Sequence, residues 1–288
     1  MTSPADPRHE PILTVADLSV RIAGLHILQG VSFTVAPRGV TVLLGRNGVG
    51  KTTTLRAVLG LTPRGGEVRG TVRMAGRSLT GESTHRLVRA GLGYVPEDRC
   101  VFAGLTVAEN LRLAERRSGV AAPGVGDTAA VGRAVPDYDR VYELFPELKR
   151  RGRQRAGSLS GGQQQMLAIG RVLLNDNRLL LVDEPTKGLA PKVVTEVAEV
   201  LERVAVAVPV LLVEQNLAVV RRLARDAVVL AAGRVAWTGD AGGLLRETEL
   251  TRSLLGVGTH GETAAPAERA ATGAVPAPAD ATGEVAGR

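Results

Sequence analysis

Short apolar runs alternate with amphipathic stretches along this chain of 288 residues. Near its start, residues 12–22, 31–35 and 40–44 have the clustered or alternating apolar positions that predict strands, and Gly24 and Gly30 separate the first two runs. The third run leads directly into a glycine-rich segment. The pattern therefore predicts a β-rich beginning that ends in a loop.

The alternation of strand and helix patterns continues to about residue 239. Further strands are predicted at residues 68–76, 91–95, 179–183, 208–214, 227–231 and 234–239. Helices are predicted at residues 51–59, within 78–91, at 106–113 and 141–148, from residue 160, and at 191–204 and 217–224. Strands and helices that alternate in this way predict the α/β class.

Two of the predicted helices begin with a capping box. Thr106 is followed three residues later by Glu109, and Ser160 is followed three residues later by Gln163. In such a box the first side chain accepts from a backbone N–H of the helix, while the second reaches back to the first residue's own N–H. We therefore expect helices to start at these two places.

Three segments have no hydrophobic period. We predict that residues 1–10 are a disordered amino terminus and that residues 118–136 form a flexible surface insertion. Residues 256–288 are rich in Ala, Gly, Pro and Thr, so they cannot bury enough apolar surface to offset the entropy lost on ordering. We predict a disordered tail there and a folded domain over residues 11–255.

Composition excludes several classes of protein. No apolar run reaches the roughly 20 residues that a membrane-spanning helix needs, and the first residues lack the apolar core of a signal peptide. We therefore expect the chain to stay in the cytoplasm. Cys100 is the only cysteine, which excludes an intramolecular disulfide and a cysteine-based zinc site.

The chain is basic, with a net charge of +7 from 36 basic and 29 acidic residues. Such an excess suits a polyanion, but it does not choose between nucleic acid, anionic lipid and a nucleotide. Aromatic residues make up only 2% of the chain and do not interleave with the basic clusters at 149–155 and 221–225. We interpret these clusters as solvated faces or faces near lipid, and expect no nucleic-acid partner.

The glycine-rich segment after the third strand has the pattern G-x-x-x-x-G-K-T of a phosphate-binding loop. Its glycines let backbone N–H groups turn toward phosphates, Lys51 adds a positive charge near the β- and γ-phosphates, and Thr52 offers a hydroxyl to magnesium. We expect ATP to contact the whole loop and Lys51 to act in catalysis. The predicted contacts are Gly45, Arg46, Asn47, Gly48, Val49, Gly50, Lys51, Thr52 and Thr53.

An acidic pair follows the apolar run that ends at Val182. Parallel strands deliver the residues after them to the ligand side of an open α/β sheet. Asp183 is therefore the expected magnesium partner, and Glu184 is the expected general base for the attacking water. Pro185 is expected to stop the strand and to bias Glu184 toward extended geometry.

Residues 159–163 read Leu-Ser-Gly-Gly-Gln, and with the phosphate loop and the acidic pair they make the chain resemble the ATP-binding-cassette (ABC) ATPases from about residue 11 to 256. The resemblance implies an ABC-type nucleotide-binding domain with a RecA-like mixed or parallel sheet core, an antiparallel β subdomain and a helical signature subdomain at about 104–175. In that family this motif binds the γ-phosphate of ATP held by the opposite subunit. The resemblance thus implies that Ser160, Gly161, Gly162 and Gln163 contact ATP, and that a second ATPase subunit, identical or paralogous, completes a head-to-tail dimer.

Residues 94–111, 141–171 and 179–191 are most similar to the smaller ATP-binding subunit of branched-chain amino-acid importers. The resemblance implies an ATPase motor on the inner face of the cell membrane, with a permease bound near Glu97–Leu105 and a solute-binding protein as an indirect partner. In this reading Val101, Phe102 and Leu105 form a groove for a coupling helix. Importers of urea and amides are similar, and a soluble ABC ATPase without a permease is the other alternative. A GTPase would need an N-K-x-D motif, which the chain lacks.

Four positions depart from the wider family pattern. Glu97 stands where a glutamine is usual, and its carboxylate can still bind magnesium. Gln215 replaces the usual histidine and can contact both γ-phosphate and water without a titratable charge. Ile22 stands where an aromatic side chain usually stacks on adenine, so we expect aliphatic contact with the base. Pro191 replaces a usual aspartate.

Overall fold

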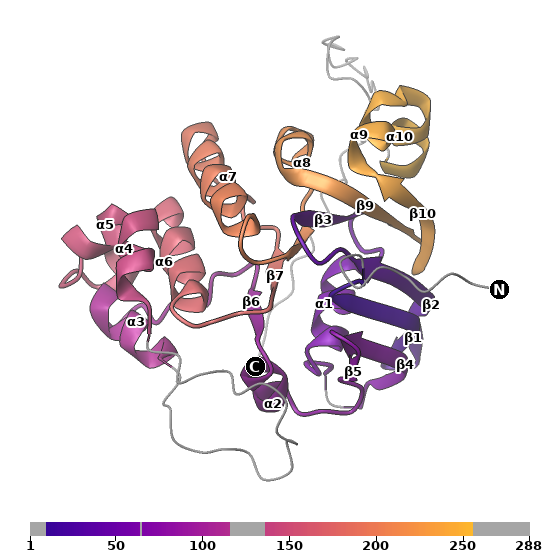
Figure 1. Cartoon of the computed structure of the whole chain (residues 1–288), viewed down its shortest axis with the longest axis horizontal. Helices are drawn as coiled ribbons and strands as arrows, with labels where there is room; N and C mark the ends of the chain where they lie inside the picture. The colour runs from indigo at the N-terminus through magenta and orange to yellow at the C-terminus, as the bar shows by residue number, and fades with distance from the viewer. Residues whose placement is uncertain (1–9, 64, 116–135, 256–288) are drawn as a thin grey trace, which may run out of the picture. The chain divides into compact units, whose positions relative to one another are not determined.

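The computed structural model describes residues 10–63, 65–115 and 136–255, and it contains two sheets (Figure 1). The first is antiparallel, with strand order β2-β1-β4-β5. Its strands are β1 (Leu13–Ile22), β2 (Leu25–Val35), β4 (Glu67–Met74) and β5 (Arg77–Ser78). Side chains alternate between buried and exposed positions along β2 from Val31 to Val35, as expected for a sheet with one face on the core.

The second sheet has the order β10-β9-β3-β8-β7-β6 and is parallel except for the β9–β10 pair. Its strands are β3 (Val40–Leu44), β6 (Leu92–Val95), β7 (Leu179–Asp183), β8 (Val210–Val213), β9 (Ala224–Ala231) and β10 (Arg234–Asp240). Every residue of β3, β7 and β8 is buried, because helices or the other sheet cover both faces. Asp183 lies opposite Val213 in the register, so the loops after β7 and β8 leave the sheet side by side.

Helices connect these strands (Figure 1). They are α1 (Lys51–Val58), α2 (Thr84–Arg89), α3 (Val107–Ala114), α4 (Tyr138–Leu144), α5 (Pro146–Arg150), α6 (Gly161–Leu173), α7 (Pro191–Ala205), α8 (Leu217–Leu223), α9 (Ala241–Arg246) and α10 (Thr248–Leu255). A short 3-10 turn covers Ala156–Ser158. No helix within the described ranges is long and apolar enough to cross a membrane.

The core has two parts, one on each face of the second sheet. In β7, Leu180 and Val182 belong to the part that α3 to α7 complete, whereas Leu179 and Leu181 belong to the part shared with the first sheet and α1. This alternation follows from the period of two in a strand. The sheet is therefore held between two apolar layers, which fixes the edge where its strands end.

The expected α/β class, with an antiparallel sheet beside a mixed sheet, is confirmed. Both capping boxes are confirmed as well: Thr106 with Glu109 opens α3, and Ser160 with Gln163 opens α6. Helices α3 to α6 lie within the predicted helical part at 104–175. The predictions for residues 1–9, 118–135 and 256–288 fall outside the described residues.

Two expectations about the elements were wrong. Gly30 does not end a strand; it lies inside β2 at a φ of 69°, where the pairing with β1 shifts register. A glycine at positive φ marks a bulge as readily as a turn. The helices α9 and α10 were not predicted, because they are short and α9 contains two adjacent glycines that weaken the helical pattern.

Candidate functional site

The phosphate loop joins β3 to α1 and depends on glycines for its shape. Gly45 and Gly50 have φ values of 142° and 105°, which side chains rarely adopt. A Cβ at Gly45 would lie 2.4 Å from the carbonyl oxygen of Leu230, and one at Gly50 would lie 2.4 Å from the Leu28 side chain. Gly48 has open space where its Cβ would be. The phosphate loop thus packs against Leu230 and Leu28 at its two ends and has open space at Gly48.

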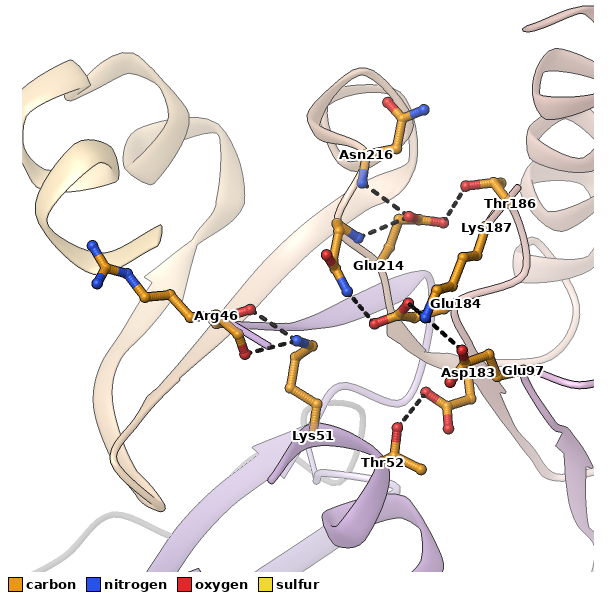
Figure 2. A network of polar contacts seen from close by, with 12 residues as sticks. Arg46, Lys51, Thr52, Glu97, Asp183, Glu184, Thr186, Lys187, Glu214 and Asn216 are labelled. Atoms are coloured by element: carbon orange, nitrogen blue, oxygen red, sulfur yellow. Dashed lines mark hydrogen bonds and ion pairs between the residues drawn. The ribbon is translucent and has the colours of Figure 1, made fainter. Parts of the chain in front are cut away.

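Lys51 begins α1, and its side chain folds over the loop (Figure 2). Its Nζ donates to the carbonyl oxygens of Gly45 at 2.8 Å and Arg46 at 3.1 Å. Burial lowers the pKa of this ammonium, although the carboxylates of Glu184 and Asp183 act in the opposite direction. The Lys51 residue as a whole is 5% exposed. Burial and the two hydrogen bonds therefore hold the ammonium at the phosphate loop.

Thr52 and Asp183 come together across the sheet edge. The Thr52 hydroxyl donates to Asp183 Oδ1 at 3.1 Å, and the Tyr94 hydroxyl lies 3.5 Å from Asp183 Oδ2. Asp183 is fully buried, and burial raises the pKa of its carboxyl to about 6, with the Thr52 hydrogen bond acting against this. Burial, and next the charge of Asp183, raise the pKa of Tyr94 to about 12. Tyr94 was not predicted, because its partner is distant in sequence.

The donor set at Thr52 and Asp183 fits magnesium. A hydroxyl oxygen and one carboxylate are hard ligands, and Mg²⁺ in nucleotide sites is held by one or two carboxylates together with phosphates and water. No cluster of three or more His, Cys, Asp or Glu side chains suited to a metal occurs within residues 10–63, 65–115 and 136–255. The protein alone therefore does not build an all-protein metal cage here, as expected for an ion that arrives with phosphates.

Glu184 and Gln215 are in contact at the same edge. Gln215 Nε2 donates to Glu184 Oε1, and the backbone N–H of Glu184 donates to the carbonyl oxygen of Val213 at 2.9 Å. The loops after β7 and β8 are thus joined through the two residues predicted to handle the attacking water. Glu184 is 7% exposed.

The expected extended geometry of Glu184 was wrong. The strand does stop before Pro185, since β7 ends at Asp183. Glu184 itself has a φ of 43°, in the left-handed region that costs a residue with a Cβ about 1–2 kcal/mol. Pro185 does bias the residue before it toward extended geometry, but Glu184 is held on both sides: its N–H donates to the Val213 carbonyl at 2.9 Å, and its carbonyl accepts from the Lys187 N–H at 3.2 Å.

Lys187 bridges the two acidic groups that flank the site. Its Nζ lies 2.6 Å from Glu97 Oε1 and 3.5 Å from Glu184 Oε2. The hydrogen bond to Glu97, and then the charge of Glu184, raise the pKa of Lys187. Glu97 thus faces a lysine in this structure, and we keep its role toward magnesium as a prediction. Only the scarcity of lysine, four in the chain, hinted that Lys187 has a special place.

Two further buried residues at this edge were not predicted. Glu214, the residue after β8, is 3% exposed, and Thr186, in the loop after β7, is 4% exposed. The Thr186 hydroxyl donates to Glu214 Oε2 at 2.7 Å. Glu214 stands at the end of a predicted strand, which was the one available signal, because acidic residues at such ends face the ligand side.

Residues 159–163, which we call the signature segment, lead into α6, and Ser160 is the N-cap of this helix. The segment has no hydrogen bond to the described residues around Asp183, Glu184 and Glu214. Ser160 accepts from the Gln163 N–H at 3.3 Å, and Gln163 Oε1 accepts from the Ser160 N–H at 3.0 Å. A Cβ at Gly162 would lie 2.5 Å from the Val193 side chain in α7, while one at Gly161 would approach the Arg99 guanidinium at 3.3 Å. The packing of α6 on α7 therefore requires a glycine at position 162, and Gly161 is next to the positively charged guanidinium of Arg99.

The segment predicted to meet a permease is held from inside by Asn110, which is fully buried. Asn110 Oδ1 accepts from the Phe102 N–H at 2.9 Å, and its Nδ2 donates to the carbonyl oxygens of Phe102 and Thr106 at 3.1 Å and 2.9 Å. The Phe102 ring is 48% exposed, with the Arg171 guanidinium 5.0 Å from its centroid. The loop is thus ordered while its aromatic side chain faces outward; Val101 and Leu105 are half-buried.

The remaining predicted residues lie near the loop or apart from it. Arg46, Asn47 and Val49 belong to the loop, and Thr53 lies in the first turn of α1. Ile22 ends β1, pairs with Leu25 of β2 and packs half-buried against the core part of the first sheet. Pro191 is the first residue of α7.

The chain is similar to known proteins. Residues 28–187 match the ABC transporter family. The chain is 37% identical over 246 residues to the high-affinity branched-chain amino acid transport ATP-binding protein BraG of Pseudomonas aeruginosa, covering 85% of this chain and 100% of that protein. It is 32% identical to the probable branched-chain amino acid transport ATP-binding protein LivF of Archaeoglobus fulgidus, covering 85% and 99%. Among solved structures, a nucleotide-free ATP-binding cassette from an ABC transporter superposes with a TM-score of 0.68 at 22% identity, covering 84% of this chain and 98% of that one.

Proposed function

This chain belongs to the ABC transporter family, and on that basis we propose that it is the ATP-hydrolysing motor subunit of a membrane importer for branched-chain amino acids. Each of the two relatives described above matches 85% of this chain, and both carry that transport in their names. The observation that carries the catalytic part of the proposal is the contact between Gln215 and Glu184 beside the phosphate loop.

The phosphate loop would bind the ATP phosphates. When they arrive, the Lys51 ammonium would exchange the carbonyl oxygens of Gly45 and Arg46 for β- and γ-phosphate oxygens. Thr52 and Asp183 would hold magnesium, which when bound neutralises charge on the phosphates. Because Lys51 is already buried and aligned, little reorganisation is needed at that step.

Glu184 would accept a proton from the attacking water. As the water oxygen bonds to the γ-phosphorus, the bond from that phosphorus to the β–γ bridging oxygen breaks, and the proton passes toward the Glu184 carboxylate. Gln215 holds one Glu184 oxygen through its Nε2 and can orient the water with its own carbonyl oxygen. Glutamine has no charge that titrates near pH 6.5, so we expect no histidine-type step in the pH profile.

A second ATPase subunit would complete the site with its signature segment. The Ser160 hydroxyl and the electropositive start of α6, a helix of 13 residues, suit a γ-phosphate. The loop held by Asn110, with Phe102 outward, would contact the permease at the inner face of the membrane. A solute-binding protein would then act on the permease rather than on this chain.

The hydrolysis proposal is tested with E184Q and Q215A in the full chain, and E249Q on the exposed face of α10 serves as the charge-matched control. Loss of a general base typically costs at least about 100-fold in kcat. We expect such losses for E184Q and Q215A with ATP affinity kept, and unchanged turnover for E249Q. Turnover by either site variant within about threefold of wild type would refute its assigned role.

The substrate is tested by uptake in cells from which the gene has been deleted. Restored uptake of radiolabelled leucine, isoleucine and valine by the wild-type gene, but not by E184Q, supports the proposal. Restored uptake of urea or an amide instead would assign the related importer class. Unchanged uptake of all these solutes, with the protein absent from membrane fractions, would indicate an ABC ATPase that does not serve transport.

A further inference from the structure

Glu214 is a buried carboxylate that the hydrolysis chemistry does not use. It directly follows β8, one residue before Gln215, and it is 3% exposed. A buried charge is costly unless hydrogen bonds compensate it. Its partners therefore indicate what it does.

Both oxygens of this carboxylate are occupied. Oε1 accepts from the backbone N–H groups of Gln215 at 2.7 Å and Asn216 at 2.9 Å. Oε2 accepts from the Thr186 hydroxyl at 2.7 Å. Donors to a carboxylate form short, strong bonds, and these three come from two different loops (Figure 2).

The hydrogen bonds from the Gln215 and Asn216 N–H groups to Glu214 restrain the backbone that carries the Gln215 side chain. Asn216 continues the restraint, because its Oδ1 accepts from the N–H groups of Ala218 and Val219 at the start of α8. On the other side, Thr186 lies two residues after Glu184 in the loop that leaves β7. The position of Gln215 relative to Glu184 therefore depends on one carboxylate that holds both loops.

We propose that Glu214 is a positioning residue that couples the loop after β7 to the loop after β8 through Thr186, and so sets Gln215 against Glu184 for ATP hydrolysis. This inference rests on the proposed roles of Gln215 and Glu184. The register supports it, since Asp183 and Val213 are opposite and Glu184 and Glu214 are the next residues on adjacent strands. Aligned groups matter here because a displacement of about 1 Å can cost about 100-fold in rate.

The test compares E214A, E214Q, T186V and T186S in the full chain. Each is measured for kcat, for KM with ATP and for the number of ATP molecules bound per chain at saturation, which counts the folded sites. We expect E214A to lose about 100-fold in kcat, with KM and binding stoichiometry near wild type. E214Q should recover most of this loss, because its carbonyl oxygen can still accept from both backbone N–H groups. T186V should lower kcat by about 10-fold and T186S should not, since only the first removes the hydroxyl.

Two results overturn the inference. One is a kcat for E214A and T186V within about threefold of wild type. The other is a fall in kcat that is matched by an equal fall in binding stoichiometry, which would show a structural role only. If E214A does not fold, the test uses E214Q, T186V and T186S, and the same comparison of kcat with binding stoichiometry is applied to them. Q215A is measured alongside: full activity of Q215A refutes the proposed function, whereas an inactive Q215A with active E214A refutes this inference alone.

Discussion

Replacing Asp183 by asparagine should stabilise the nucleotide-free protein at high pH while removing the proposed magnesium-dependent ATPase activity. Asp183 is fully buried, and burial raises the pKa of its carboxyl from 3.8 to about 6 in the folded state. The unfolded chain keeps the ordinary value. Above pH 6 both states are ionised, so folding pays for taking a charge out of water; below about pH 4 both are protonated and this penalty vanishes.

The size of the effect follows from the two pKa values. One pKa unit corresponds to about 1.4 kcal/mol, so the difference between 3.8 and about 6 corresponds to about 3 kcal/mol. Asparagine is neutral, fits the same space and can still accept from the Thr52 hydroxyl. The gain in unfolding free energy of D183N over wild type should therefore be about 0.5 kcal/mol at pH 4 and grow to about 3 kcal/mol at pH 8.

The assay is urea unfolding followed by circular dichroism, with EDTA and without nucleotide, at several pH values between 4 and 8. Other titrating groups are the same in both proteins, so the difference between the two pH profiles isolates position 183. Parallel profiles, or a D183N protein less stable than wild type at pH 8, would refute the reasoning. ATPase activity of D183N is measured on the same samples and should be lost.

Three other substitutions test separate features. N110A should lower the unfolding free energy by about 2–3 kcal/mol, because it removes a fully buried amide together with its hydrogen bonds to the Phe102 N–H and to the carbonyl oxygens of Phe102 and Thr106; urea unfolding measures this, and a loss near zero would contradict it. G162A should destabilise by about 1–2 kcal/mol despite the better helix propensity of alanine, since the new Cβ meets the rigid Val193 side chain at 2.5 Å. The double variant G162A/V193A should then lose less than the sum of the two single changes, and strict additivity would count against the clash. I22W should tighten ATP binding about fivefold, because tryptophan offers a surface on which adenine can stack. The wild-type protein should bind ATP and GTP with similar affinity. Both affinities are measured by calorimetry, and no gain for I22W would show that Ile22 does not contact the base.

Local patterns were enough for most elements and for the phosphate loop. The run of apolar residues before Asp183 predicted a buried strand, and Thr106 and Ser160 marked helix starts that the structure confirms. These features depend on neighbours within a few residues, so the sequence displays them directly. The sequence also placed Asp183, Glu184 and Gln215 at or just after strand ends, and Lys51 and Thr52 at the start of the helix after the phosphate loop. The structure gathers these residues at one edge.

Contacts between distant residues could not be predicted in the same way. The bond between Thr186 and Glu214 joins positions 28 apart, and the bond between Lys187 and Glu97 joins positions 90 apart. Each requires the order β8-β7-β6 in the sheet, and no short-range pattern specifies which strands become neighbours. The left-handed geometry of Glu184 likewise could not be read from Pro185, because the Glu184 N–H is bonded to Val213 on another strand.

The sequence by itself therefore determined which groups we assign to phosphate, magnesium and water in the proposed function, because its motifs hold those groups at fixed short spacings. The tertiary structure alone decided how the carboxylates are used. Sheet order and register put Asp183 out of water beside Thr52, turned Glu97 toward Lys187 and placed Glu214 between two loops. Burial and hydrogen-bond partners distinguish these three acids, and both arise only when distant segments pack together.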